Sequence, residues 1–204
     1  EPYSPWGAFG GRTRSGPLNE WIGGSFLSCA ATERIVCVGR SKSIAVQPPP
    51  APDSAKLTYL TNTPLVPGGM TPDQACDASK PSTAGSVRAV IATTTASAAN
   101  RLNTNSIYAR PDGVILGLGS QLLAGTQASG VWQRGDGSYT AGMFRSGAGS
   151  ITQLGTQTCL DWTSSSGTLS AWVSMGAHLP EWWSSGGAGD YPCSSGFSLL
   201  CVEQ

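Results

Sequence analysis

The chain has 204 residues, of which 12 are basic and 12 are acidic, so its formal net charge is zero and charged residues make up only 12% of it. Without an excess of positive charge there is no field to attract nucleic acid or an anionic membrane, and we expect neither as a partner. The 27 glycines and 14 prolines amount to about a fifth of the chain, below the share typical of disorder. No apolar run approaches the roughly 18 residues needed for membrane insertion.

The first 46 residues carry a pattern that returns near the other end of the chain. The pattern is a Glu-Trp pair followed by two cysteines with seven residues between them, found at Glu20-Trp21, Cys29 and Cys37 and again at Glu181-Trp182, Cys193 and Cys201. This similarity predicts that 1–46 is the C-terminal remnant of a repeated module. The alternative is that two unrelated buried strands that end in Cys-Val look alike.

A proline-rich linker is predicted over 47–53, because its prolines cannot pair in a sheet interior and favour extended polyproline geometry. The remaining segment, 54–204, is long enough for one complete domain. Its patterns predict only short elements: a strand over 56–61, a helix that opens at Thr71, a strand over 87–92, a helix over 95–102, turns at Asp112-Gly113 and Asp136-Gly137, a strand over 199–203, and loops over 146–150, 164–167 and 184–189.

The six cysteines indicate disulfide bonds rather than a zinc site. They include no Cys-x-x-Cys pair, and the chain has a single histidine. Disulfide bonds place the protein in an oxidising compartment, so we expect a secreted or cell-surface protein. The first residues have neither a basic n-region nor an apolar h-region, so we expect a chain from which an export signal has been removed.

Several short motifs after the linker resemble, in their order and spacing, the bacterial endostatin-like, C-type-lectin-like domains of secreted and surface proteins. The residues that carry the resemblance are 61–65, Ala75-Cys76, 87–91, 97–102, 111–116, 159–164 and Cys193 with 200–204, which together span about 150 residues. The resemblance implies an α+β, C-type-lectin-like (endostatin-like) fold with short strands, two short helices and a long loop region, closed by disulfide bonds.

The resemblance also implies a nested disulfide pattern. The first and fourth cysteines of the domain would pair, Cys76 with Cys201, and the second and third would pair, Cys159 with Cys193. Spacing alone leaves 15 connectivities open for six cysteines. Cys29 and Cys37 are expected to bond to each other, with cysteines of a missing segment or a second chain as the alternative.

No pattern in the sequence favours an enzyme. His178 is the only imidazole available to a Ser-His-Asp triad, and no Gly-x-Ser-x-Gly elbow accompanies it. The Asp and Glu residues mostly stand next to Gly or in turns, where local hydrogen bonding explains them. We therefore expect a non-catalytic protein.

Metal and cofactor binding are not expected either. The calcium-binding motifs of C-type lectins are missing from the lectin-like region, and Arg110-Pro111-Asp112-Gly113 is better interpreted as a β-turn. The zinc-binding histidines and the basic cluster of animal endostatin are missing too.

The candidate ligand-binding residues lie in the long loop region, where aromatic and polar side chains of the kind enriched at binding hot spots occur together: Trp132, Arg134, Asp136, Tyr139, Phe144 and Arg145. An alternative interpretation is that the tryptophans of this region pack in the core.

Two functions follow as expectations. The first is an extracellular binding or adhesion module that recognises a protein or a glycan through its loop face. The second is a structural subunit of a filament or surface assembly, in which 1–46 mediates self-association or pairs with a partner chain through a strand edge.

Overall fold

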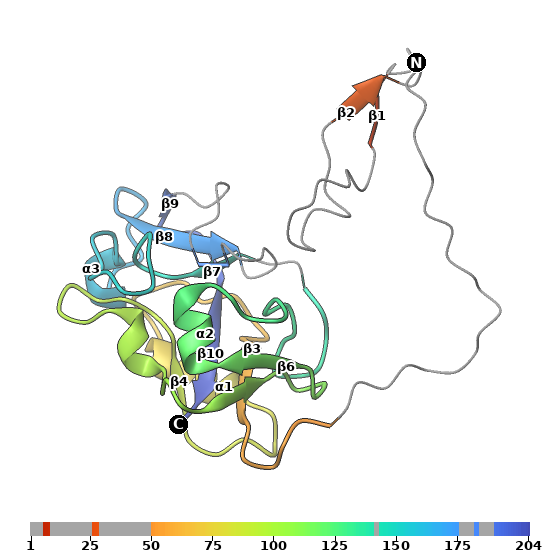
Figure 1. Ribbon diagram of the computed structural model, residues 1–204. Helices are drawn as coiled ribbons and strands as arrows, with labels where there is room; N and C mark the ends of the chain where they lie inside the picture. Colours follow the sequence, from red (N-terminus) through yellow and green to blue (C-terminus); the bar gives the residue numbers. More distant parts are fainter. Residues whose placement is uncertain (1–5, 9–25, 29–49, 141–142, 176–181, 184–189) are drawn as a thin grey trace. The chain divides into compact units, whose positions relative to one another are not determined.

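We describe a computed structural model of the chain, which places residues 6–8, 26–28, 50–140, 143–175, 182–183 and 190–204 (Figure 1). The chain divides into two compact units, Glu1–Gln47 and Pro48–Gln204. In the first unit, β1 (Trp6–Ala8) pairs with β2 (Phe26–Ser28) in antiparallel fashion. Cys29, Cys37 and most of the predicted remnant lie outside the described residues, so the repeat and its role in assembly stay predictions.

The second unit is an α+β domain built on a mixed sheet with the strand order β6-β5-β3-β10-β7-β8-β9, and β4 also pairs with β10. The β3–β5 and β10–β7 pairs are parallel and the other pairs are antiparallel. The strands are β3 (Lys56–Leu60), β4 (Val87–Ala89), β5 (Ile107–Ala109), β6 (Ile115–Leu118), β7 (Met143–Arg145), β8 (Ser170–Met175), β9 (Asp190–Pro192) and β10 (Ser198–Glu203). The helical segments are α1 (Pro72–Ser79), η2 (Ala98–Arg101), α2 (Gly119–Ala124) and α3 (Cys159–Trp162).

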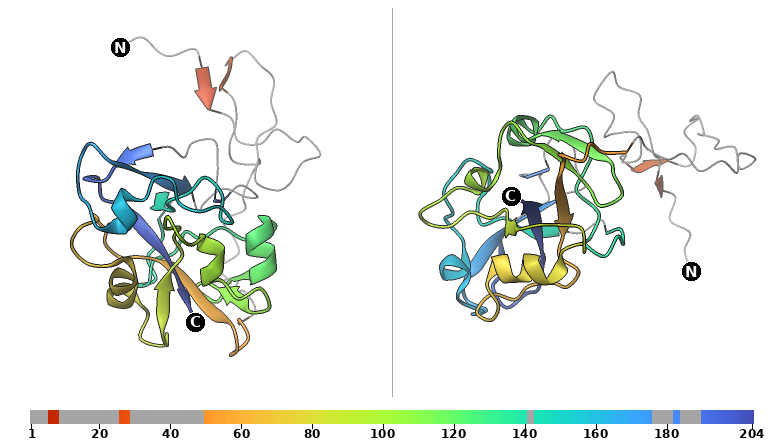
Figure 2. Two further views of the ribbon diagram at one scale, coloured as in Figure 1. Left: turned by 90° about the vertical axis from the view of Figure 1, so that its left-hand side faces the viewer. Right: turned by 90° about the horizontal axis from the view of Figure 1, so that it is seen from below.

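The last strand, β10, lies in the middle of the domain and is buried from Ser198 to Val202. Alternate residues of a strand point to opposite faces. Leu200 and Val202 accordingly join one hydrophobic cluster, and Leu199 and Cys201 join another. Helix α1, yellow in Figure 2, packs on the side of the second cluster. The end of the domain thus pairs with its first strand, β3, and forms the centre of the core.

Two disulfide bonds fasten the domain around this strand. Cys76 in α1 bonds to Cys201 in β10 across 125 residues, and Cys159 bonds to Cys193 across 34 residues. This is the nested pattern that the resemblance implied. No helix among the described residues is both long enough and apolar enough to cross a membrane.

Helix α1 begins where the sequence predicts. The Thr71 hydroxyl accepts a hydrogen bond from the Gln74 backbone N–H, and the Gln74 side chain accepts one from the Thr71 N–H, which forms a capping box. The predicted helix over 95–102 is only a 3₁₀ turn, η2, and the predicted strand over 87–92 is regular only in β4. Helix α2 is an additional element that begins at Gly119.

Helix α3 is a left-handed turn. Cys159, Leu160, Asp161 and Trp162 all have positive φ, between 48° and 71°. The left-handed conformation costs an L-residue roughly 1–2 kcal/mol. Contacts made by the turn must therefore offset several kcal/mol of conformational energy over its four residues. The Asp161 carboxylate accepts hydrogen bonds from the Thr94 N–H and hydroxyl, the buried Trp162 donates its indole N–H to the Ala92 carbonyl, and Cys159 is cross-linked.

The two disulfides should differ in their effect on stability. The Cys76→Ala/Cys201→Ala variant should lose about 5 kcal/mol of unfolding free energy and the Cys159→Ala/Cys193→Ala variant about 4 kcal/mol, because the entropy restored to the unfolded chain grows with loop length. Urea unfolding followed by circular dichroism measures both. A loss below about 1 kcal/mol for the first variant would contradict this expectation.

Candidate functional site

The candidate site is built around the β-hairpin formed by 131–140. The Arg134 N–H donates to the Ser138 carbonyl at 2.8 Å, and the Thr140 N–H donates to the Trp132 carbonyl at 2.7 Å. The Gly137 N–H closes the turn on the Arg134 carbonyl, and Gly137 has φ +85°, a conformation that favours glycine. Trp132 and Tyr139 therefore lie on opposite strands of one short hairpin.

The hairpin is attached to the end of β3. The Leu60 N–H donates to the Gln133 carbonyl at 2.9 Å, and the Gly135 N–H donates to the Leu60 carbonyl at 3.0 Å. Position 135 has no room for a side chain, since a Cβ there would lie 1.7 Å from the Ser79 carbonyl oxygen. The sheet thus fixes the position of the hairpin through backbone contacts.

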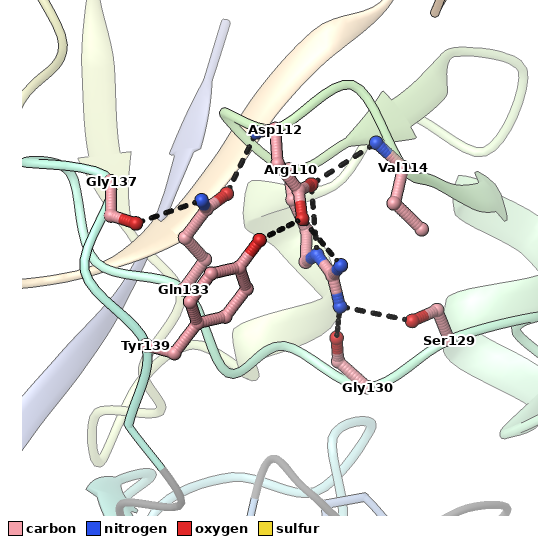
Figure 3. A network of polar contacts seen from close by, with 8 residues as sticks. All are labelled: Arg110, Asp112, Val114, Ser129, Gly130, Gln133, Gly137 and Tyr139. Carbon is pink, nitrogen blue, oxygen red and sulfur yellow. Dashed lines mark hydrogen bonds and ion pairs between the residues drawn. The ribbon is translucent and has the colours of Figure 1, made fainter. Parts of the chain in front are cut away.

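A salt bridge between Arg110 and Asp112 lies beneath the hairpin (Figure 3). The Arg110 Nε and Nη2 donate to the two carboxylate oxygens of Asp112 at 3.1 and 2.6 Å. Arg110 Nη1 donates to the Ser129 hydroxyl at 3.1 Å and the Gly130 carbonyl at 3.3 Å. The side chains are only 6% and 17% exposed, so this bidentate pair is largely shielded from solvent.

The pair spans the predicted β-turn after β5, in which the Gly113 N–H donates to the Arg110 carbonyl at 2.9 Å. Gln133 connects this turn to the hairpin. Its side-chain oxygen accepts from the Asp112 N–H at 2.7 Å, and its Nε2 donates to the Gly137 carbonyl at 3.0 Å. Gln133 is buried, and these two bonds use both ends of its amide.

The Asp112 carboxylate accepts four hydrogen bonds. Besides the two from Arg110, Val114 N–H donates to Oδ1 at 3.1 Å and the Tyr139 hydroxyl donates to Oδ2 at 2.8 Å. Burial acts to raise the pKa of Asp112, but the hydrogen bonds from Arg110, Tyr139 and Val114 together hold it below its usual value. The same bond to Asp112 raises the pKa of Tyr139, with burial adding to it.

Two aromatic rings lie over the guanidinium. The Arg110 Cζ lies 5.5 Å from the ring centroid of Trp132 and 6.0 Å from that of Tyr139, within the range of a cation–π contact. The rings are nevertheless 36% and 65% exposed. Together with Arg110 and Thr140 they line a pocket of about 510 Å³, a size usual for ligand pockets.

The six candidate residues from the sequence fall into three places. Trp132 and Tyr139 are at the pocket. Arg134 and Asp136 belong to the hairpin turn, where the Asp136 carboxylate accepts from the N–H and hydroxyl of Ser138. Phe144 and Arg145 are completely buried in β7, so they do not line a ligand-binding surface.

Arg145 has a structural role in the core. Its Nη2 donates to the carbonyls of Pro192 and Ser195, and its guanidinium lies 5.1 Å from the Phe197 ring centroid. Burial lowers the pKa of Arg145 to about 10, so it stays charged at neutral pH. The ion pairs found among the described residues do not include Arg145, and the carbonyl oxygens solvate its charge instead.

Arg110, Asp112, Gln133 and Thr140 were not predicted as site residues. Arg110 and Asp112 stand two positions apart in a turn, and such a pair has no distinctive sequence pattern. Their proximity to Tyr139 comes from the tertiary structure. No group of three or more potential metal ligands occurs in the described part of the chain, and His178 lies outside it.

Removing the carboxylate should destabilise the fold. Asp112→Asn leaves Arg110 shielded without an anionic partner, and we expect it to cost about 3 kcal/mol of unfolding free energy in urea denaturation. Asp136→Asn is the matched control, because Asp136 is exposed and bonds within its own turn. Equal effects of the two variants would contradict the importance of the salt bridge.

The acid dependence of the contribution that Asp112 makes to stability should change when Tyr139 is replaced. Since the folded pKa of Asp112 is below the unfolded value of about 3.9, Asp112 stabilises the fold above that pH and its contribution is lost as the pH falls through the folded pKa. Tyr139→Phe removes a bond that lowers this pKa, so the folded pKa of Asp112 should rise toward the unfolded value, and the contribution of Asp112 should be smaller and fully lost at a higher pH. NMR titration of the Asp112 carboxyl carbon tests this, and an unchanged pKa would refute it.

In comparisons with known proteins, no protein-family model matches the chain and the search of curated proteins finds no match.

Proposed function

We propose that this chain is a non-catalytic, extracellular binding or adhesion module with a C-type-lectin-like, endostatin-like domain over 54–204. Its ligand is a protein or a glycan. Trp132, Tyr139 and Thr140 make the contact at the pocket beneath the hairpin, and Arg110, Asp112 and Gln133 hold them in place.

The lectin-like assignment is supported by the connectivity of the domain. The first strand, β3, pairs with the last strand, β10, and one disulfide bond lies within the sequence span of the other. Motifs that carry the resemblance lie in α1, β4, α3 and β10, and the first of them directly follows β3. An extracellular location is supported by the two disulfide bonds, which persist in oxidising compartments.

The binding role is supported above all by the exposure of two aromatic rings on a rigid base. Trp132 and Tyr139 remain open to solvent although a network of hydrogen bonds fixes the hairpin that carries them. A ligand that binds rings already in position loses little additional conformational entropy. Aromatic residues in such positions dominate binding energy at many interfaces.

The non-catalytic role is supported by the state of Asp112, which bonds to two of the residues that line the pocket, Arg110 and Tyr139. A general base needs a free lone pair and a pKa near the working pH. Asp112 has a lowered pKa, and its carboxylate oxygens already accept four hydrogen bonds. It is therefore suited to holding Arg110 and Tyr139 rather than to moving a proton.

The binding role is tested with the full, fluorescently labelled chain on arrays of purified extracellular-matrix proteins and of neutral and acidic glycans. Trp132→Ala and Tyr139→Ala should each reduce binding to the recognised spots by about tenfold, because each removes a ring contact. Leu154→Ala is the matched control, since Leu154 is 53% exposed but does not line the pocket.

Unchanged binding by both aromatic variants, with the fold intact by circular dichroism, would refute this role for the hairpin.

A further inference from the structure

We infer that the pocket at the hairpin binds a proline-rich segment, and that the run 47–53 of a second copy of this chain supplies it. This inference rests on the proposed function, because it names the ligand of the same binding face. It follows from the hydrogen-bonding groups that the pocket leaves free, from its charge, and from the place where the chain's own proline-rich run meets the domain.

Among the described residues, each polar group of the pocket that makes no hydrogen bond can donate one, and the Thr140 hydroxyl can also accept. The four hydrogen bonds to Asp112 fill its oxygens. Of the five guanidinium N–H groups of Arg110, four donate in the bonds described, which leaves one on Nη2. Within the described residues, no hydrogen bond uses the indole N–H of Trp132 or the hydroxyl of Thr140. A complementary ligand therefore needs acceptors more than donors.

The charge of the pocket favours a neutral ligand. Asp112 neutralises Arg110, so no net charge is available to attract an anion. A cationic ligand is disfavoured, because the Arg110 guanidinium already lies over both aromatic rings and would repel it. Apolar contact with Trp132 and Tyr139 is what remains, together with hydrogen bonds donated by the protein.

A proline-rich peptide has the required chemistry. Proline lacks the backbone N–H, so each proline offers a carbonyl acceptor and no donor. Its ring presents a C–H face that packs on aromatic side chains, and the extended polyproline helix forms with little entropy loss. The hydroxyl groups of a neutral sugar bring a donor with every acceptor, and with the oxygens of Asp112 filled only the hydroxyl oxygens of Thr140 and Tyr139 remain to accept from them.

The chain itself carries such a segment, of which the structure describes residues 50–53. The run Gln47-Pro48-Pro49-Pro50-Ala51-Pro52-Asp53 has four prolines, and its described part enters the domain next to the turn that holds Asp112. A Cβ at Gly113 would lie 3.8 Å from the Ala51 nitrogen. Ala51 is not among the residues that line the pocket, which leaves the pocket available to another copy.

Pairing of one copy's run with the next copy's pocket is a heterologous contact. The two surfaces that meet are different, so each bound copy still has either a run or a pocket that can pair with a further copy. Such a contact extends into a ring or an open chain of copies. This predicts self-association that depends on concentration.

Peptide binding is tested with the full-length chain and a synthetic peptide of residues 44–54, followed by tryptophan fluorescence and NMR. Replacing Pro48, Pro49 and Pro50 of the peptide by Ala should weaken binding by at least about tenfold, as should Trp132→Ala in the chain. The Leu154→Ala chain should bind the peptide normally. Cellohexaose serves as a neutral sugar probe and should not compete.

Self-association is tested by analytical ultracentrifugation of the full chain. The average mass should rise with concentration and return to that of the monomer when excess peptide is added or when Trp132 is replaced by Ala. A chain that stays monomeric, or a peptide that does not bind at about 1 mM, would overturn the inference. If the aromatic variants nevertheless lose binding on the protein and glycan arrays, the binding face stands and only its ligand is different.

Discussion

The domain depends on the burial of its last strand. β10 is apolar on both faces, and it can be buried only if the chain brings β3 to one edge and β4 and β7 to the other. Because these neighbouring strands are far apart in sequence, much of the domain must fold before the core around β10 is complete. The Cys76–Cys201 bond fastens this arrangement by joining α1 to the centre of the sheet.

The candidate site uses this frame as a rigid support. Leu60 at the end of β3 holds the hairpin, and β5 leads directly into the turn that carries the salt bridge. Burying Arg110 and Asp112 costs desolvation energy, which their bidentate contact and further hydrogen bonds offset. The Arg110–Asp112 pair therefore positions Trp132 and Tyr139, and because its two charges cancel it presents no net charge to a ligand.

The sequence predicts those features that have local causes. The capping residues locate α1, apolar runs locate β3 and β10, and the Asp136-Gly137 dipeptide locates the turn of the hairpin. The disulfide pattern came from the resemblance, since spacing alone could not select it. The salt bridge was missed because its contacts with Tyr139 are tertiary. Arg145 was included among the candidate binding residues because aromatic and polar side chains occur together in this region, and no local pattern indicates that it is buried in β7. The left-handed turn likewise lacks a glycine that would predict it.

Arg145 has a consequence for how this protein can diverge. Its guanidinium recognises main-chain oxygens of Pro192 and Ser195, which every amino acid possesses. The side chains of Pro192, Ser194 and Ser195 are therefore open to replacement while the anchor persists, whereas Arg145 itself is not. Natural variants of this domain can accordingly exchange the residues around Cys193 and alter the surface there, and the loop will keep its attachment to the core.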